Sequence, residues 1–177
     1  LQRLAKNHTS RDFDRAVVLT RAAGIALAPT FVAFTPWTTL EGYIAMLERI
    51  VELRLVESVP TVQLGIRLLV PAGSHLLRLP DFAKAVLPFD AKLLGYPWLH
   101  TDPRVDRLQR DVQRLVSHAD DEGLTRSKAF AAVWRVAHEA AGRAAPDIAM
   151  SREDAIPRLS EPWYCCAEPT ERQLRSF

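Results

Sequence analysis

Hydrophobic positions follow two different periods along the chain. Between residues 59 and 70 they alternate with polar positions, which is typical of a β-strand with one covered face. The apolar face of this predicted strand carries Val62, Leu64, Ile66, Leu68 and Val70. We expect that face to pack against helices, while Gln63 and Arg67 on the opposite face line an interior.

A second buried strand is predicted just before a long helix. Residues 27–34 are rich in aromatic and β-branched side chains, and Pro36 ends the segment because proline has no N–H to donate to a sheet. Thr38 and Glu41 have the spacing of a capping box, in which each side chain accepts from the backbone N–H of the other residue. A helix with apolar residues at helical spacing is expected to follow, to about residue 55.

Helical spacing of apolar residues recurs in other segments, most of which follow a residue that favours a helix N-cap. These caps are Thr9 with Asp12, Asp102 followed by Pro103, and Thr125. The further predicted helices are residues 11–23, 81–87, 103–119 and 126–141.

Composition indicates an ordinary globular chain. Of 177 residues, 48% are hydrophobic and 25% charged, and the net charge of +2 arises from mixed charges without a basic stripe, which argues against nucleic-acid binding. No apolar run approaches the roughly 18 residues of a membrane span, so no membrane partner is expected. The two cysteines are neighbours, which favours a reducing, cytoplasmic location over a disulfide framework.

The order of predicted elements points to a parallel sheet. Helix, strand, helix and strand follow one another over residues 11–70, which is the pattern of parallel strands joined by helical crossovers. Two parallel strands cannot satisfy both of their edges. Because the chain also begins at Leu1 rather than at Met, our interpretation is that it is a fragment of a longer polypeptide.

The adjacent pair Cys165 and Cys166 is the clearest candidate for chemistry. Neighbouring cysteines can close only a strained ring, and strain makes a disulfide easier to reduce. The pattern therefore suits redox or nucleophilic chemistry. Two unpaired thiols beside a docking Trp163 are one alternative. Two thiolates bound to a metal are another, although the sequence has no Cys or His at a recognised zinc spacing to complete the ligand set.

Three other residues have alternative interpretations. Arg67 on an otherwise apolar strand needs an anion, which is either a ligand or an acidic side chain of a missing part. Gln63 shares its face. Trp37 either stacks on a ligand or plugs the end of a barrel. No metal site is expected, because His and Cys residues lack recognised ligand spacing and the acidic run at 120–122 reads as a solvated turn.

Two local patterns together resemble one known family. The tail Cys165-Cys166-Ala167-Glu168-Pro169 resembles the signature of the radical S-adenosylmethionine (SAM) proteins that are named for a CUAEP or CCAEP tail. The runs at residues 28–40 and 66–74 look like the fifth and sixth strands of the radical SAM barrel with their following turns. With the helix before them, the similarity covers essentially the whole chain.

The resemblance implies an α/β fold, the C-terminal part of a parallel (β/α)6 partial barrel, followed by a mainly helical extension and an extended tail. The barrel portion would occupy residues 1–78, the extension residues 79–141 and the tail residues 142–177. The missing N-terminal half of the same polypeptide would be the partner that completes the barrel.

The resemblance also implies a chemistry. In the family, a CxxxCxxC loop binds a 4Fe–4S cluster that cleaves SAM to a 5′-deoxyadenosyl radical, with a small-molecule or peptide substrate. That loop is absent from this sequence, so the chain alone is expected to be inactive. Cobalamin is left open as a further cofactor. Cys165 and Cys166 would be catalytic, and the residues facing cofactor or substrate would be Thr35, Pro36, Trp37, Gln63, Arg67 and Leu69.

Two other functions compete with this interpretation. The chain could be a non-enzymatic helical interaction module whose strands pair with a partner, or the end of an unrelated α/β-barrel hydrolase. A CxxxCxxC motif in the reading frame upstream of Leu1 would distinguish the radical SAM parent from both.

Overall fold

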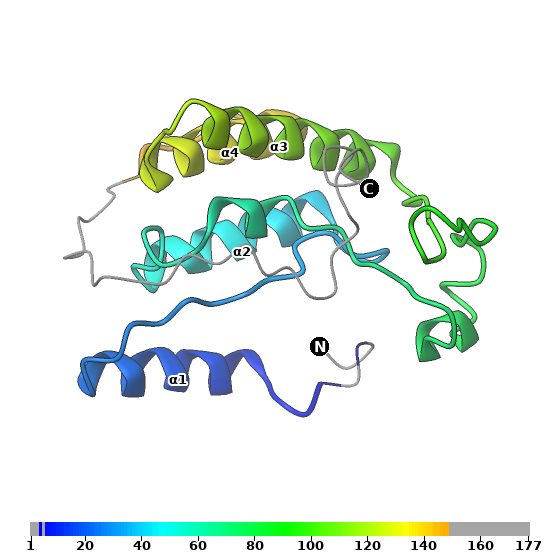
Figure 1. Cartoon of the computed structure of the whole chain (residues 1–177). Helices are drawn as coiled ribbons and strands as arrows, with labels where there is room; N and C mark the ends of the chain where they lie inside the picture. The colour runs from blue at the N-terminus through cyan, green and yellow to red at the C-terminus, as the bar shows by residue number, and fades with distance from the viewer. Residues whose placement is uncertain (1–3, 5, 149–177) are drawn as a thin grey trace.

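Helices dominate the computed structural model, which describes Leu4 and residues 6–148 (Figure 1). No helix in this part of the chain is long and apolar enough to span a membrane. The α-helices are α1 (Ser10–Ala22), α2 (Leu40–Glu52), α3 (Pro103–Asp121) and α4 (Arg126–Ala140), and the 3-10 helices are η2 (Thr61–Leu64) and η3 (His75–Arg78).

The predicted caps of α1, α3 and α4 are confirmed. Thr9 and Asp12 form a reciprocal capping box, in which the Asp12 N–H donates to Thr9 Oγ1 at 3.3 Å and the Thr9 N–H donates to Asp12 Oδ2 at 2.8 Å. Asp102 caps α3 with Pro103 at the first position, and Thr125 caps α4. These caps depend on residues three apart or fewer, which is why they could be read from the sequence.

Two helix predictions were wrong in detail. The N-cap of α2 is Thr39, which accepts from the Gly42 N–H at 2.9 Å, whereas Thr38 bonds within the preceding turn. The helix ends at Glu52, three residues earlier than predicted. Residues 81–85 form turns and Val86 is bridged to Trp98, so the helix predicted at residues 81–87 is absent.

The predicted α/β partial barrel is also wrong. No strand or sheet is present in the described residues, and the fold is mainly helical. The segments predicted as neighbouring strands meet at a single parallel bridge between Phe34 and Arg67, where the Phe34 N–H donates to Ile66 O and the Leu68 N–H donates to Phe34 O, each at 2.9 Å. The alternative that the chain is the end of an α/β-barrel hydrolase requires the same barrel strands, so the structure does not support it either.

Local hydrogen bonds explain why the segment 59–70 does not extend as a strand. The Gln63 N–H donates to Pro60 O at 2.9 Å and the Gly65 N–H to Val62 O at 3.0 Å, which closes η2. These N–H and C=O groups are paired within three residues, so the first half of the segment does not offer them to a neighbouring strand. Four of the five residues of the predicted apolar face are nevertheless buried, namely Leu64, Ile66, Leu68 and Val70, whereas Val62 is half-buried.

A first hydrophobic cluster joins α2, α3 and α4. Figure 1 shows α3 and α4 on one side of α2, with α1 on the other side and an extended segment between them. The cluster includes Phe34, Leu47, Val112 and Trp134, all of which are buried. Core packing between helices therefore replaces the sheet that the sequence pattern suggested.

The long connector between η3 and α3 projects from one end of the molecule (Figure 1) and contributes two residues to a second hydrophobic cluster. This cluster consists of Leu68, Val70, Leu76, Phe82 and Trp98. Because it includes residues on both sides of residue 78, the predicted boundary there runs through a shared core. Residues 149–177, most of the predicted tail, lie outside the described residues.

Candidate functional site

The turn after Phe34 is held by its own threonines. The Thr35 N–H donates to Thr38 Oγ1 at 2.9 Å, and the Thr38 hydroxyl also contacts Ala33 O at 3.2 Å and Thr35 Oγ1 at 3.0 Å. Pro36 is buried within the turn. The turn that the resemblance assigns to cofactor binding is thus a braced connection between the Phe34 bridge and α2.

Trp37 lies against the connector. Its indole Nε1 donates to Asp81 Oδ2 at 2.7 Å, and its ring centroid lies 6.2 Å from that of Phe82. The side chain packs against the second hydrophobic cluster and remains partly exposed. Trp37 therefore packs against its own chain, which is closer to the interpretation as a plug than to the interpretation as a surface for stacking a ligand. The described residues contain no barrel for it to close.

Gln63 and Leu69 both contact other parts of the chain. Gln63 is 3% exposed, and its Oε1 accepts from the Phe31 N–H at 3.0 Å. Leu69 lies beside Gly95, where an added Cβ would come within 3.0 Å of Leu69 Cδ1. Gln63 therefore links η2 to the segment before Phe34, and Leu69 packs on the connector.

Arg67 is the centre of a polar network that joins three parts of the chain. Its Nη1 donates to Asp106 Oδ1 at 2.8 Å, and its Nη2 donates to Trp98 O. The guanidinium carbon lies 3.5 Å from the centroid of the Trp98 ring, a cation–π arrangement. The anion that Arg67 requires is thus a carboxylate of α3 within this chain.

The network continues from Asp106 to the start of α3. Asp106 Oδ2 accepts from the His100 N–H at 3.0 Å, and His100 Nδ1 accepts from the Asp102 N–H at 2.9 Å. The side chain of Arg104 donates to Asp102 and, together with the Arg104 backbone N–H, lowers the pKa of that carboxyl to about 2. Hydrogen bonds of His100 and Asp102, the last residues of the connector, therefore attach the connector to the first turn of α3.

Asp106 and Trp98 were missed by the sequence analysis. Asp106 lies next to the apolar stripe of α3, one residue after buried Val105 and three before buried Gln109. Two polar residues on the core side of an amphipathic helix indicate buried partners, and that signal was present in the sequence. Trp98, whose Nε1 donates to Leu68 O at 2.9 Å, carried no comparable signal.

The structure brings four of the predicted residues close to one bridge. Thr35 and Pro36 follow Phe34 directly, while Arg67 pairs with Phe34 and Leu69 follows shortly after it. The predicted catalytic residues Cys165 and Cys166 lie outside the described residues, so their position relative to this network stays a prediction.

No family model, curated protein or solved structure matches the chain. Because the two predicted barrel strands are absent from the described residues, the resemblance to radical SAM proteins rests mainly on the tail pentapeptide at residues 165–169.

The residues present fit the implied cofactors poorly. The sequence has only two cysteines and so cannot supply the three thiolates of a CxxxCxxC loop. No group of three metal-binding side chains occurs in the described residues. Gln63 and Arg67 direct their polar ends at partners within the chain, so as placed they do not fit direct ligands of SAM. Their cofactor-binding role stays a prediction.

Proposed function

We propose that this chain works as part of a radical SAM enzyme, to which it contributes the vicinal dithiol Cys165-Cys166 and the helical body that carries it. The observation that supports this most is the pentapeptide Cys165-Cys166-Ala167-Glu168-Pro169, which resembles the family's tail signature. The iron–sulfur cluster belongs to another part of that enzyme, because this sequence lacks the CxxxCxxC loop. A reducing compartment such as the cytoplasm keeps such thiols available.

The dithiol can act in two ways after the radical has been generated elsewhere. Closing the pair to a disulfide gives two electrons and two protons to an oxidised substrate intermediate, and a thiol of the glutathione class reduces the strained disulfide again. Alternatively, one thiolate adds to an electrophilic intermediate, and the other thiolate then attacks the sulfur of that adduct. This second attack forms the Cys165–Cys166 disulfide and releases the intermediate reduced by two electrons, and a thiol of the glutathione class then reduces the disulfide. Both roles require the two thiols to be adjacent, as they are here.

The first test uses the chain as it stands. In glutathione buffers of graded ratio, Cys165 and Cys166 should form a reversible intramolecular disulfide, seen as a two-hydrogen loss in mass and as protection from thiol labelling. Oxidation that yields only intermolecular dimers would exclude a cycling dithiol.

The second test uses the parent polypeptide that carries the cluster loop. Cys165→Ser and Cys166→Ser should each abolish product formation and leave SAM cleavage intact, because the dithiol acts after cleavage. Ser176→Ala is the matched control in the same tail. Full turnover in both cysteine variants would remove the dithiol from the mechanism.

An interaction module is the second candidate. It is favoured by exposed apolar side chains on and after α1, where Val18, Leu19 and Ile25 are each more than half exposed. If the chain acts only by binding a partner, Val18→Glu should weaken that binding. Neither cysteine substitution should then change product formation by the parent polypeptide. The cysteine experiment above therefore separates the two candidates.

A further inference from the structure

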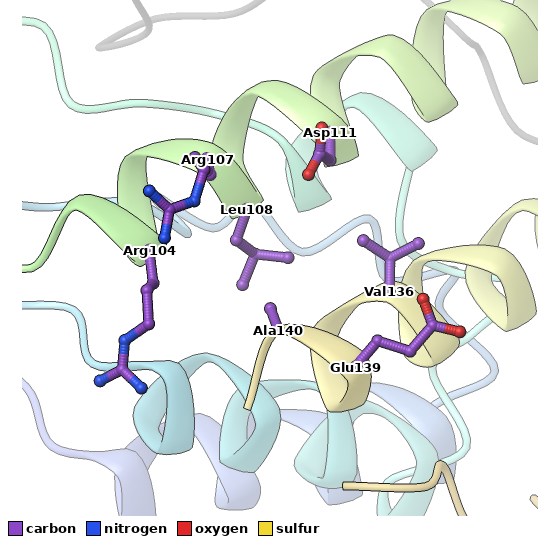
Figure 2. Close-up of a pocket in the computed structure, with 7 residues that line it drawn as sticks. All are labelled: Arg104, Arg107, Leu108, Asp111, Val136, Glu139 and Ala140. Atoms are coloured by element: carbon purple, nitrogen blue, oxygen red, sulfur yellow. The ribbon is translucent and has the colours of Figure 1, made fainter. Parts of the chain in front are cut away.

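A groove of about 250 Å³ between α3 and α4 carries opposite charges at its two ends (Figure 2). Arg104 and Arg107 of α3 lie at the basic end, and Asp111 of α3 and Glu139 of α4 lie at the acidic end. The apolar floor between the two ends consists of Leu108, Val136 and Ala140.

One residue at each end has no ionic partner. Arg107 and Glu139 are exposed, and neither forms an ion pair within the residues that the structure describes. Arg104, in contrast, pairs with Asp102 at 2.7 Å. A segment with a negative group, an apolar group and a positive group in that order would complement the groove.

We propose that this groove binds the chain's own segment 158–161. The segment reads Arg158-Leu159-Ser160-Glu161, and it contains one cation, one apolar side chain and one anion. It belongs to the 29 residues after Ile148, which lie outside the described part of the chain. No other stretch of those residues places a leucine between a basic and an acidic residue at this spacing.

Charge sets the direction of binding. In the proposed complex, Glu161 lies at the basic end, which Arg104 and Arg107 form. Arg158 then lies at the acidic end, which Asp111 and Glu139 form. Leu159 then covers the apolar floor. The segment runs antiparallel to α3, because the basic end of the groove is the N-terminal end of that helix.

The lengths agree with this placement. Arg158 and Glu161 are three residues apart, which is about 10 Å in an extended chain. The helix from Arg104 to Asp111 advances seven residues, which is also about 10 Å. A segment of this length, in extended form, therefore spans the groove along α3 from its basic residues to its acidic residues.

The connection from the body is also long enough. The Trp134 Nε1 donates to Pro146 O at 2.9 Å, so the described chain ends alongside α4. The ten residues from Ile148 to Arg158 can span about 33 Å, whereas the 15 residues of α4 extend over about 22 Å. The segment can therefore reach either end of the groove.

Docking would hold the dithiol near the N-terminal end of α3. Cys165 and Cys166 follow Glu161 by four and five residues, so they lie within about 17 Å of the basic end. The use made of the thiols there rests on the proposed function, whereas the docking of the segment does not.

The only cysteines of the chain serve as reporters of the docking. In the full chain with Cys165→Ser, a nitroxide on Cys166 should selectively broaden amide NMR signals around Arg107 and Leu108 of α3 and Ala140 of α4. Glu161→Arg should abolish this broadening, because it places like charges together. Adding Arg107→Glu to that variant should restore it. Leu159→Asp should also abolish it by burying a charge on the apolar floor.

Arg110→Glu is the matched control, since Arg110 is an exposed residue of the same helix that does not line the groove. It should leave the broadening unchanged. Uniform broadening, equal loss with Arg110→Glu, or failure of the charge swap would overturn the proposal. Broadening of an isotope-labelled chain by a separately nitroxide-labelled chain would assign the groove to a second copy.

The docking and the proposed function fail in different ways. A dithiol that cycles normally while Glu161→Arg changes no NMR signal would overturn the docking alone. A docked segment whose cysteines are silent in turnover would overturn the proposed function alone.

Discussion

At the scale of single residues, the partner of Arg67 shows that this side chain has a structural role, because its anion is Asp106 of the same chain. Its charge is balanced by Asp106, with side-chain exposures of 12% and 11%, and its guanidinium covers Trp98. A charge buried to this degree is tolerated only when it is paired and hydrogen-bonded. The pair connects the bridge at Phe34 to α3 and so stabilises the fold directly.

Asp106→Ala should therefore destabilise the chain by about 3–5 kcal/mol, because it leaves Arg67 buried without its carboxylate. Asp111→Ala is the control, since the Asp111–Arg114 pair is exposed and should contribute less than about 1 kcal/mol. Urea denaturation of both variants measures the difference. Equal losses would show that Arg67 does not depend on Asp106.

The carboxyl of Asp102 provides a pH prediction. Its pKa is lowered to about 2 by the hydrogen bonds from Arg104, so its contribution to stability is present above the ordinary pKa and is lost as the pH falls toward 2. Titration of the carboxyl carbon by NMR should show the lowered pKa. Arg104→Ala should return it toward 3.8, and Arg107→Ala should leave it unchanged. An unchanged pKa in Arg104→Ala would refute the assigned cause.

At the scale of elements, the connector between η3 and α3 packs closely on the segment after Arg67. The Tyr96 N–H donates to Val70 O at 2.8 Å, and Gly95 is bridged to Pro71. This close approach of two backbones requires the absence of a side chain at Gly95. Packing of this kind attaches irregular chain to the core without a sheet.

Gly95→Ala should cost about 1–3 kcal/mol, because the new Cβ would come within 3.0 Å of both Val70 O and Leu69 Cδ1. Gly65→Ala is the matched control, since its Cβ would lie 3.5 Å from the nearest atom, which is ordinary contact. Thermal unfolding of the two variants compares them. A Gly95 variant as stable as the Gly65 variant would contradict the close approach.

At the scale of the whole molecule, stability is unevenly distributed. α1 buries only Val17 and is attached by few contacts, including the Arg49–Asp14 ion pair at 2.5 Å and the donation from Arg21 to Leu53 O at 2.8 Å. α4 instead packs Phe130 and several other side chains into the first cluster. Local opening free energies follow the buried apolar contacts of each region.

Native-state hydrogen exchange should therefore show α1 opening before α4. Phe13→Ala, which removes the edge-to-face contact with Phe31 at 5.7 Å, should lower protection in α1 and leave α4 unchanged. Equal protection of both helices in the unmodified chain would show a single cooperative unit.

The sequence alone determined most helix starts and the burial of alternating apolar residues. Caps such as Thr9 and Asp102 act within three residues, and hydrophobic side chains are buried in any compact fold, so both could be predicted locally. It could not determine strand formation, because a ladder needs distant partners, and η2 satisfied its backbone locally instead. The tertiary structure alone decided that Arg67 meets Asp106, 39 residues away, since ion pairing between distant residues depends on which elements pack together.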